Sequence, residues 1–153
     1  MSSFSYTPFI QHSDDTTEYR LLTKDHVRVE SFNGKKVLVV DQEAIEQLTY
    51  EAFTDVNFYL RENHIKQVAN ILKDPEATDN DKFVANALLQ NAVIAAHGEL
   101  PSCQDTGTAI VNAYKGYNVF TEDNDKASLT KAIRQVYQDH NLRYSQIIPS
   151  TMF

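Results

Sequence analysis

Cysteine is the scarcest reactive residue in this chain, with one copy in 153 residues, and tryptophan is absent. One cysteine excludes an internal disulfide, and with it the disulfide-stapled frameworks of small secreted domains. A chain of this length can bury a core without such a staple. Glycine and proline number only four each, and we find no internal repeat, low-complexity tract or linker. We therefore expect one folded unit over residues 1–153.

Positive charge is also in short supply. Fourteen Lys and Arg stand against 21 Asp and Glu, which gives a formal net charge of -7. Nucleic-acid binding needs clustered basic residues, so we expect no nucleic-acid partner. A small anionic substrate remains compatible, because a local arginine can outweigh a distant acidic surface that salt screens.

Long apolar runs are missing as well. No stretch approaches the roughly twenty residues that a membrane-spanning helix needs. The first ten residues, "MSSFSYTPFI", lack the basic and apolar regions of a secretory signal. We therefore expect a cytoplasmic protein with no membrane partner.

The residues that are present predict a mixed α/β, helix-rich fold. A β-hairpin is expected near the N-terminus, where Val27, Val29 and Phe32 follow strand periodicity, Asn33-Gly34 marks a two-residue turn, and residues 37–40 return. Asp41 is placed to cap the following helix. Its apolar residues recur at helical spacing and predict one buried face: Ile45, Leu48, Ala52, Phe53, Val56 and Leu60.

Two further helices are expected before the cysteine. "NHIKQVANILKD" predicts a helix with Ile65, Val68, Ala69 and Leu72 inward, which Asp74-Pro75 stops. The next helix is expected from near Asp79 to His97, with Gly98 at its C-terminal end.

A second strand pair is predicted after the cysteine, in "TAIVNAYKGYNVFT", with its turn at Lys115-Gly116. The last helix is expected in residues 123–145. Its inner face comprises Ala132, Ile133, Val136 and Tyr137. The chain then finishes on an apolar tail, Ile147 to Phe153, which we expect either to dock or to lead into further structure.

The stretch "LPSCQDTGTA" carries the cysteine in a polar loop between Pro101 and Gly107. Three roles for Cys103 remain open from the residues alone. It can be a small buried apolar side chain. It can be a nucleophile paired with a histidine such as His97. It can be a metal or iron–sulfur ligand, although clusters usually take three or four cysteines.

"LPSCQDTGTAIV" and "NLRYSQ", together with "DDTTEYRLLT" upstream, resemble the N-terminal region of the class I, iron–sulfur-dependent fumarate hydratases. The resemblance covers essentially the whole chain. It implies that residues 1–153 form the N-terminal portion of a hydro-lyase domain that is truncated at its C-terminus. It also implies a tricarboxylic acid cycle lyase that reversibly hydrates fumarate to malate.

The resemblance implies roles for four residues. Cys103 would be a metal ligand of a [4Fe-4S] cluster, Asp105 a catalytic residue, and Gln104 and Arg143 substrate-binding residues. A planar guanidinium suits a substrate carboxylate, because it can pair with both carboxylate oxygens. Without the resemblance, Arg143 reads as an ordinary helix-end arginine.

The other two cluster cysteines of that family would lie beyond Phe153. We therefore expect this chain alone not to hold the cluster and to be inactive, and we expect the missing C-terminal part of the enzyme and a dicarboxylate as partners. The complete enzyme is expected to be a homodimer. Two alternatives stay open: part of an L-tartrate dehydratase of the same family, and a non-catalytic folded remnant or interaction module.

Overall fold

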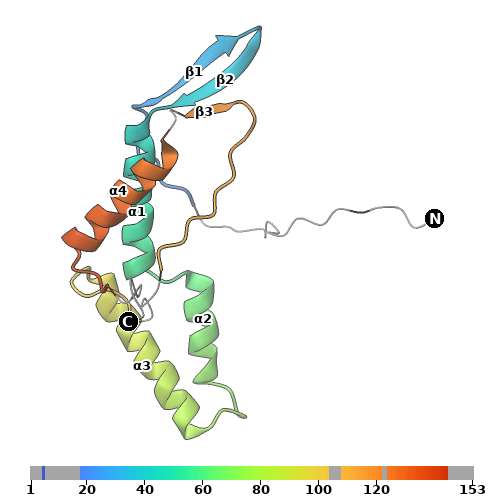
Figure 1. Cartoon of the computed structure of the whole chain (residues 1–153). Helices are drawn as coiled ribbons and strands as arrows, with labels where there is room; N and C mark the ends of the chain where they lie inside the picture. Colours follow the sequence, from blue (N-terminus) through green and yellow to red (C-terminus); the bar gives the residue numbers. More distant parts are fainter. Residues whose placement is uncertain (1–4, 6–17, 104–107, 122–123, 145–153) are drawn as a thin grey trace, which may run out of the picture.

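A computed structural model of the chain describes residues 5, 18–103, 108–121 and 124–144. Within them, a small sheet lies at one end, two helices cross in the middle, and a helical hairpin lies at the other end (Figure 1). This mixed α/β, helix-rich arrangement confirms the predicted fold class. The apolar tail after residue 144 lies outside the described residues.

The predicted hairpin is present. β1 (Val27–Phe32) pairs antiparallel with β2 (Lys35–Val40), and Phe32 faces Lys35 across the turn. Asn33 and Gly34 both have positive φ, 50° and 76°. A two-residue turn with two positive φ angles matches the right-handed twist of the paired strands, which explains why Asn-Gly closes this hairpin.

The third strand corrects the sequence-based prediction. Instead of a second strand pair turning at Lys115-Gly116, the described residues after the cysteine contain one short strand, β3 (Val119–Thr121). It joins the hairpin in parallel, with Leu38 opposite Val119. The open edge of β2 supplies the unpaired backbone groups that β3 needs, so tertiary pairing replaces a local hairpin.

Asp41 takes the predicted N-cap position of α1 (Gln42–Phe58), but its side chain does not cap the helix. The carboxylate instead accepts a hydrogen bond from Arg28 Nη1 on β1. A charged guanidinium is a stronger donor than a backbone amide, which explains the choice. The interaction ties the hairpin to the start of α1.

α1 packs against α4 (Asp125–Asp139), which forms the central layer of the molecule (Figure 1). The predicted inner face of α4 is confirmed: Ala132 and Val136 are buried, and Ile133 and Tyr137 are half-buried. On the side of α1, Phe58 is buried and its ring lies 5.1 Å from that of His140.

The predicted buried face of α1 is wrong in large part. Leu48 and Val56 are 57% and 64% exposed, and Ala52 is exposed too. The buried residues of this helix are Ala44, Thr49, Asn57 and Phe58. Helical periodicity identified an apolar stripe, but α4 packs on a different side of the helix.

α2 (Glu62–Ile71) and α3 (Asp79–Ala96) form a helical hairpin. α2 ends before the predicted stop at Asp74-Pro75, and its predicted inward residues are half-buried apart from Leu72, which is exposed. α3 begins with a capping box between Thr78 and Asp81. Gly98 has φ +79 and follows the helix as predicted.

The buried core of the described residues is small. Its apolar members are Val37, Ala44, Phe58, Ala85, Ala95, Ala132, Val136 and Leu142, of which four are alanine. Many larger apolar side chains of the same residues stay exposed, including Phe83, Val93 and Ile110. The stability of this fold therefore rests on few large buried side chains.

Candidate functional site

Cys103 is a free, exposed cysteine at the end of the segment that follows α3. This exposure contradicts the reading of Cys103 as a small buried side chain. The loop around it is bent because Gly98 turns the chain at the end of α3 and Pro101 follows shortly after. Three separate elements then hold the loop.

Asn91 on α3 supplies the first attachment. Its Oδ1 accepts a hydrogen bond from the backbone N–H of Cys103 at 3.0 Å. The bond joins residues twelve positions apart and fixes the backbone of Cys103 against the last turns of α3. The cysteine is free and exposed.

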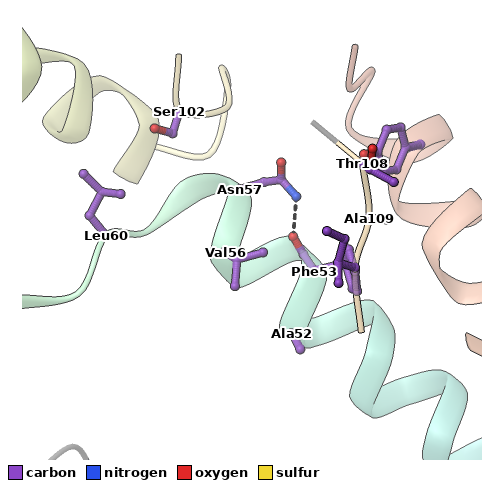
Figure 2. Close-up of a pocket in the computed structure, with 10 residues that line it drawn as sticks. Ala52, Phe53, Val56, Asn57, Leu60, Ser102, Thr108 and Ala109 are labelled. Atoms are coloured by element: carbon purple, nitrogen blue, oxygen red, sulfur yellow. Dashed lines mark hydrogen bonds between the residues drawn. The ribbon is translucent and has the colours of Figure 1, made fainter. Parts of the chain in front are cut away.

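The end of α1 supplies the second attachment. The backbone N–H of Ser102 donates to the carbonyl oxygen of Asn57 at 2.7 Å. The side-chain amide of Asn57 in turn donates to the carbonyl oxygen of Phe53 at 2.6 Å, as Figure 2 shows. Asn57 and Ser102 are both buried, so the loop enters the fold immediately before the cysteine.

Arg143 supplies the third attachment. α4 ends in a left-handed residue, Asn141 with φ 52°, and the N–H of Leu142 donates to the carbonyl oxygen of Tyr137 at 3.0 Å. This is a Schellman-type ending with asparagine in the position that glycine usually takes, and it buries Leu142. The turn directs Arg143 back toward the cysteine loop, where Nη2 donates to the carbonyl oxygen of Cys103 at 3.1 Å.

The structure therefore brings together two of the four predicted site residues, Cys103 and Arg143, which lie 40 positions apart in the sequence. Gln104 and Asp105 lie outside the described residues, and their predicted roles stay predictions. Arg143 contacts the backbone of the loop, so this hydrogen bond restrains the position of the cysteine.

Asn91, Asn57 and Ser102 are residues that sequence reasoning missed. A signal was available for the two asparagines, because asparagine is a poor residue for a helix interior and both stand inside apolar helices. The side chain of Asn57 donates a hydrogen bond to a backbone carbonyl oxygen, and that of Asn91 accepts one from a backbone N–H. Ser102 carries no comparable signal, since a serine beside a cysteine in a polar loop is unremarkable in sequence.

A cavity of about 420 Å³ lies beside the cysteine loop, between α1, α4 and the segment after the loop (Figure 2). Most of its lining is apolar, and its polar members are Asn57, Ser102 and Thr108. The Oδ1 of Asn57 and the Oγ of Ser102 are buried there without a hydrogen-bond partner. Buried polar atoms are rarely left unpaired, so these two atoms mark an unsatisfied polar position beside the cavity.

The histidines considered as a base for the thiol take other positions where the structure describes them. His97 caps the C-terminal end of α3, and His140 packs its ring against Phe58 and Tyr50 at the α1–α4 interface. Near that interface, burial raises the pKa of the Tyr50 hydroxyl, and the carboxylate of Asp139, which accepts its hydrogen bond, raises it further. These groups give no support to a thiol–imidazole pair at Cys103.

Cys103 fits the part of one ligand in a metal or cluster site, because an exposed, unpaired thiol on a fixed backbone is available for coordination. In the described ranges, no group of three or more His, Cys, Asp and Glu residues is arranged to hold a metal ion. A cubane cluster needs several thiolates, and Cys103 is the one cysteine of the sequence. Cys103 can therefore contribute to such a site but not complete it.

No helix in the part of the chain that the structure describes has both the length and the apolar character to cross a membrane.

The sequence matches the profile of the family described as fumarate hydratase (Fumerase) over residues 46–152. The chain is 50% identical over 146 residues to the aerobic class I fumarate hydratase of Escherichia coli K12, covering 95% of this chain and 26% of that relative. It is 50% identical over 147 residues to the anaerobic class I enzyme of the same organism, covering 93% and 27%. Fumarate hydratase 1, mitochondrial, of Leishmania major is 43% identical over 156 residues, covering 100% and 28%.

The chain thus spans about a quarter of the length of the relatives it matches. The matched family segment contains most of α1, all of α2 to α4, the cysteine loop and Arg143, and therefore every described residue of the candidate site. This chain belongs to the fumarate hydratase (Fumerase) family, class I.

Proposed function

We propose that this chain supplies the N-terminal share of the active site of a fumarate hydratase that interconverts fumarate and malate with a [4Fe-4S] cluster. The observation that carries the proposal is the loop at Cys103, whose backbone is held from α3 and from the end of α4 while its thiol stays exposed. Restraint of this kind suits a residue that has to present a ligand atom at a fixed position.

Cys103 would be one ligand of the cluster, and the remaining thiolates would come from the rest of the enzyme. When bound, the cluster supplies a Lewis acid for the carboxylate and hydroxyl of the substrate. The contribution of this chain is to present one thiolate at a fixed position. Asn91 holds the N–H of Cys103 and Arg143 holds its carbonyl oxygen, so the peptide units on both sides of the sulfur are restrained.

Arg143 is proposed to bind a substrate carboxylate. Removal of a proton next to a carboxylate builds charge on an anionic group, and a guanidinium stabilises that charge by bidentate pairing. Its five N–H donors allow one guanidinium to serve more than one acceptor. Arg143 Nη2 already reaches the loop that carries the cysteine, so its contact with substrate would place that carboxylate beside the cluster ligand.

Gln104 and Asp105 follow the cysteine directly in sequence. We propose that Gln104 contributes to substrate binding and that Asp105 acts in proton transfer, as the resemblance implies. Cys103 and Thr108 are the described residues on either side of this stretch in the sequence, and Thr108 lines the cavity next to the loop.

Fumarate is preferred over tartrate as the substrate because the relatives reported above are named as fumarate hydratases. A dicarboxylate substrate, the rest of the hydratase polypeptide and a homodimeric complete enzyme are the proposed partners. The cytoplasm remains the proposed compartment, and one relative is named as mitochondrial.

The proposal is tested with a chimera in which this chain replaces the matching N-terminal segment of the aerobic Escherichia coli relative. After anaerobic cluster reconstitution, the chimera is expected to show the cluster absorbance and to hydrate fumarate. Cys103→Ser is expected to remove both, and Arg143→Lys to keep the absorbance while raising the KM for fumarate.

The isolated chain serves as the comparison and is expected to show neither cluster absorbance nor fumarate hydration. Turnover by the isolated chain would show that the missing thiolates are not required. Full activity of the Cys103→Ser chimera would show that Cys103 is not a cluster ligand. A chimera that dehydrates tartrate but not fumarate would change the substrate and keep the reaction class.

A further inference from the structure

An apolar stripe on α1 is left without a partner in the described residues. Leu48, Ala52 and Val56 follow each other at four-residue spacing, so they share one face of the helix. Leu48 is 57% exposed and Val56 is 64% exposed. Helical periodicity predicts this face to be buried, whereas α4 packs elsewhere on α1. A regular apolar face that the fold does not cover is a candidate interaction surface.

The stripe runs between two hollows of the surface. The cavity of about 420 Å³ beside the cysteine loop lies on one side, and a second hollow of about 660 Å³ lies on the other. Both are lined by Ala52, Val56 and Leu60, so they form one continuous surface. Apolar side chains extend it on each side, Phe53 and Ile110 in the first hollow and Leu22 and Tyr59 in the second.

Two buried polar atoms lie at the end of this surface. Asn57 is 3% exposed and Ser102 is 4% exposed, and the Oδ1 of Asn57 and the Oγ of Ser102 have no hydrogen-bond partner. The amide nitrogen of Asn57 is already used on the carbonyl oxygen of Phe53 (Figure 2). The remaining Oδ1 can only accept, so a group that pairs with it must carry an N–H or O–H donor, and the atoms that now cover Oδ1 must move aside.

The rim of the second hollow is charged and internally paired. Arg20 Nη2 lies 2.8 Å from Glu51 Oε2 and 3.1 Å from Asp55 Oδ2. An apolar centre with a polar, solvent-exposed rim is the usual anatomy of a protein interface. A polypeptide segment suits this surface, because its apolar side chains can fill the hollows and its backbone carries the N–H donors that Asn57 Oδ1 lacks. An apolar small molecule lacks the donor, and water leaves the stripe uncovered.

The relatives indicate which polypeptide this is. About three quarters of their length has no counterpart in this chain. We propose that the stripe of Leu48, Ala52 and Val56, together with Asn57 and Ser102, is the docking site for an apolar segment of the remaining hydratase polypeptide. The proposal rests on the proposed function, because that function requires the remainder to assemble with this chain.

The decisive experiment compares two valines of equal exposure. Val56 on the stripe is 64% exposed and Val93 on α3 is 62% exposed. In the isolated chain, Val56→Asp and Val93→Asp are both expected to leave the thermal unfolding midpoint nearly unchanged. In the chimera with the aerobic Escherichia coli remainder, Val56→Asp is expected to lower the midpoint by several degrees and Val93→Asp to lower it little, because the proposal places the docked segment over Val56 and not over Val93.

Equal effects of the two substitutions in the chimera would overturn the proposal. Concentration-dependent dimerisation of the isolated chain that Val56→Asp alone abolishes, measured by sedimentation, would also overturn it, since a second copy would then be the occupant. These readouts use neither the cluster nor fumarate. An inactive chimera that still shows the Val56-specific loss therefore counts against the proposed function and not against the docking site.

A second measurement keeps the test decisive if the chimera does not fold. Overlapping synthetic peptides that cover the unmatched part of the aerobic relative are titrated against the intact 153-residue chain by fluorescence anisotropy. At least one apolar peptide is expected to bind, with affinity reduced roughly tenfold or more by Val56→Asp. Ser102→Ala is expected to reduce it less, and Val93→Asp to leave it unchanged. Binding that no variant weakens, or no binding at all, contradicts the proposal.

Discussion

At the scale of single residues, the candidate site depends on backbone contacts more than on charge. The backbone N–H of Cys103 donates to Asn91, its carbonyl oxygen accepts from Arg143, and its thiol takes no part in either bond. This arrangement restrains the position of the peptide units on both sides of the sulfur. It predicts that the side chains of Asn91 and Arg143 keep the backbone of the loop in one conformation.

Asn91→Ala tests that role. The substitution leaves the N–H of Cys103 without its acceptor, and one such hydrogen bond is worth about 1 kcal/mol. Hydrogen exchange of the Cys103 amide, followed by NMR, is expected to quicken roughly fivefold. Asn86→Ala on the exposed side of the same helix is the matched control, because it gives the same gain in helix propensity. Unchanged exchange in Asn91→Ala would show that the bond does not hold the loop.

At the scale of elements, the ends of the helices are fixed by different chemistry. α3 begins with a full capping box, in which the Thr78 hydroxyl accepts from the N–H of Asp81 and the Asp81 carboxylate accepts from the N–H of Thr78. The hydroxyl and amide of Thr78 lower the pKa of Asp81. α1 begins without such a cap, because Asp41 is engaged by Arg28.

Thr78→Ala is expected to destabilise the chain by about 1 kcal/mol, because the N–H of Asp81 loses its acceptor. Urea unfolding followed by circular dichroism measures the change. Thr78→Ser keeps the hydroxyl and is expected to retain most of the stability. If the alanine and serine variants unfold at the same urea concentration, the capping box contributes nothing measurable.

Asp125 lies at the junction of β3, α1 and α4, and its ionisation makes the stability of the fold depend on pH. Hydrogen bonds from Thr121 and then Gln42, with Lys115 nearby, lower the pKa of its carboxyl below the ordinary 3.8, against a smaller opposing effect of burial. The folded state therefore favours the ionised form. Its stabilisation is complete above the ordinary pKa and is lost as the pH falls through the lowered pKa.

Asp125→Asn is expected to lower the urea midpoint near neutral pH, and the difference from the unsubstituted chain is expected to vanish toward about pH 2. The comparison is made by urea titrations at a series of pH values. A difference that stays constant over the whole series would show that the charge of Asp125 is not the cause.

At the scale of the whole molecule, the described residues form an extended body with little buried volume (Figure 1). Phe58 is the one large aromatic side chain in its apolar core, whereas Leu48 and Val56 lie on the uncovered side of the same helix. We therefore expect the side of α1 that carries Phe58 to stabilise the isolated chain, and the side that carries Leu48 and Val56 to contribute little to its free energy of unfolding.

Phe58→Ala is expected to cost about 3–5 kcal/mol, because it leaves a cavity between α1 and α4. Leu48→Ala, at a site 57% exposed, is expected to change the free energy of unfolding by at most about 0.5 kcal/mol. Equilibrium urea unfolding of both variants gives the comparison. A large loss in Leu48→Ala would mean that the stripe is covered in solution.

Local patterns in the sequence predict much of this fold for reasons that the structure makes clear. Asn33-Gly34 closes the hairpin because both residues accept positive φ, and Gly98 follows α3 for the same reason. The inner face of α4 was identified because its partner lies on the predicted side. The second strand pair was wrong because β3 depends on the edge of β2, which lies far away in sequence.

The sequence by itself determined the family, the helix-rich mixed fold, the hairpin and the identity of the one available thiol, because each depends on residue order and local conformational preference. Only the tertiary structure decided which face of α1 is covered, that Asn91 and Arg143 meet on the backbone of Cys103, and that Asn57 and Ser102 keep unpaired polar atoms. These features depend on contacts between residues distant in the chain, and periodicity carries no information on which partner reaches which face.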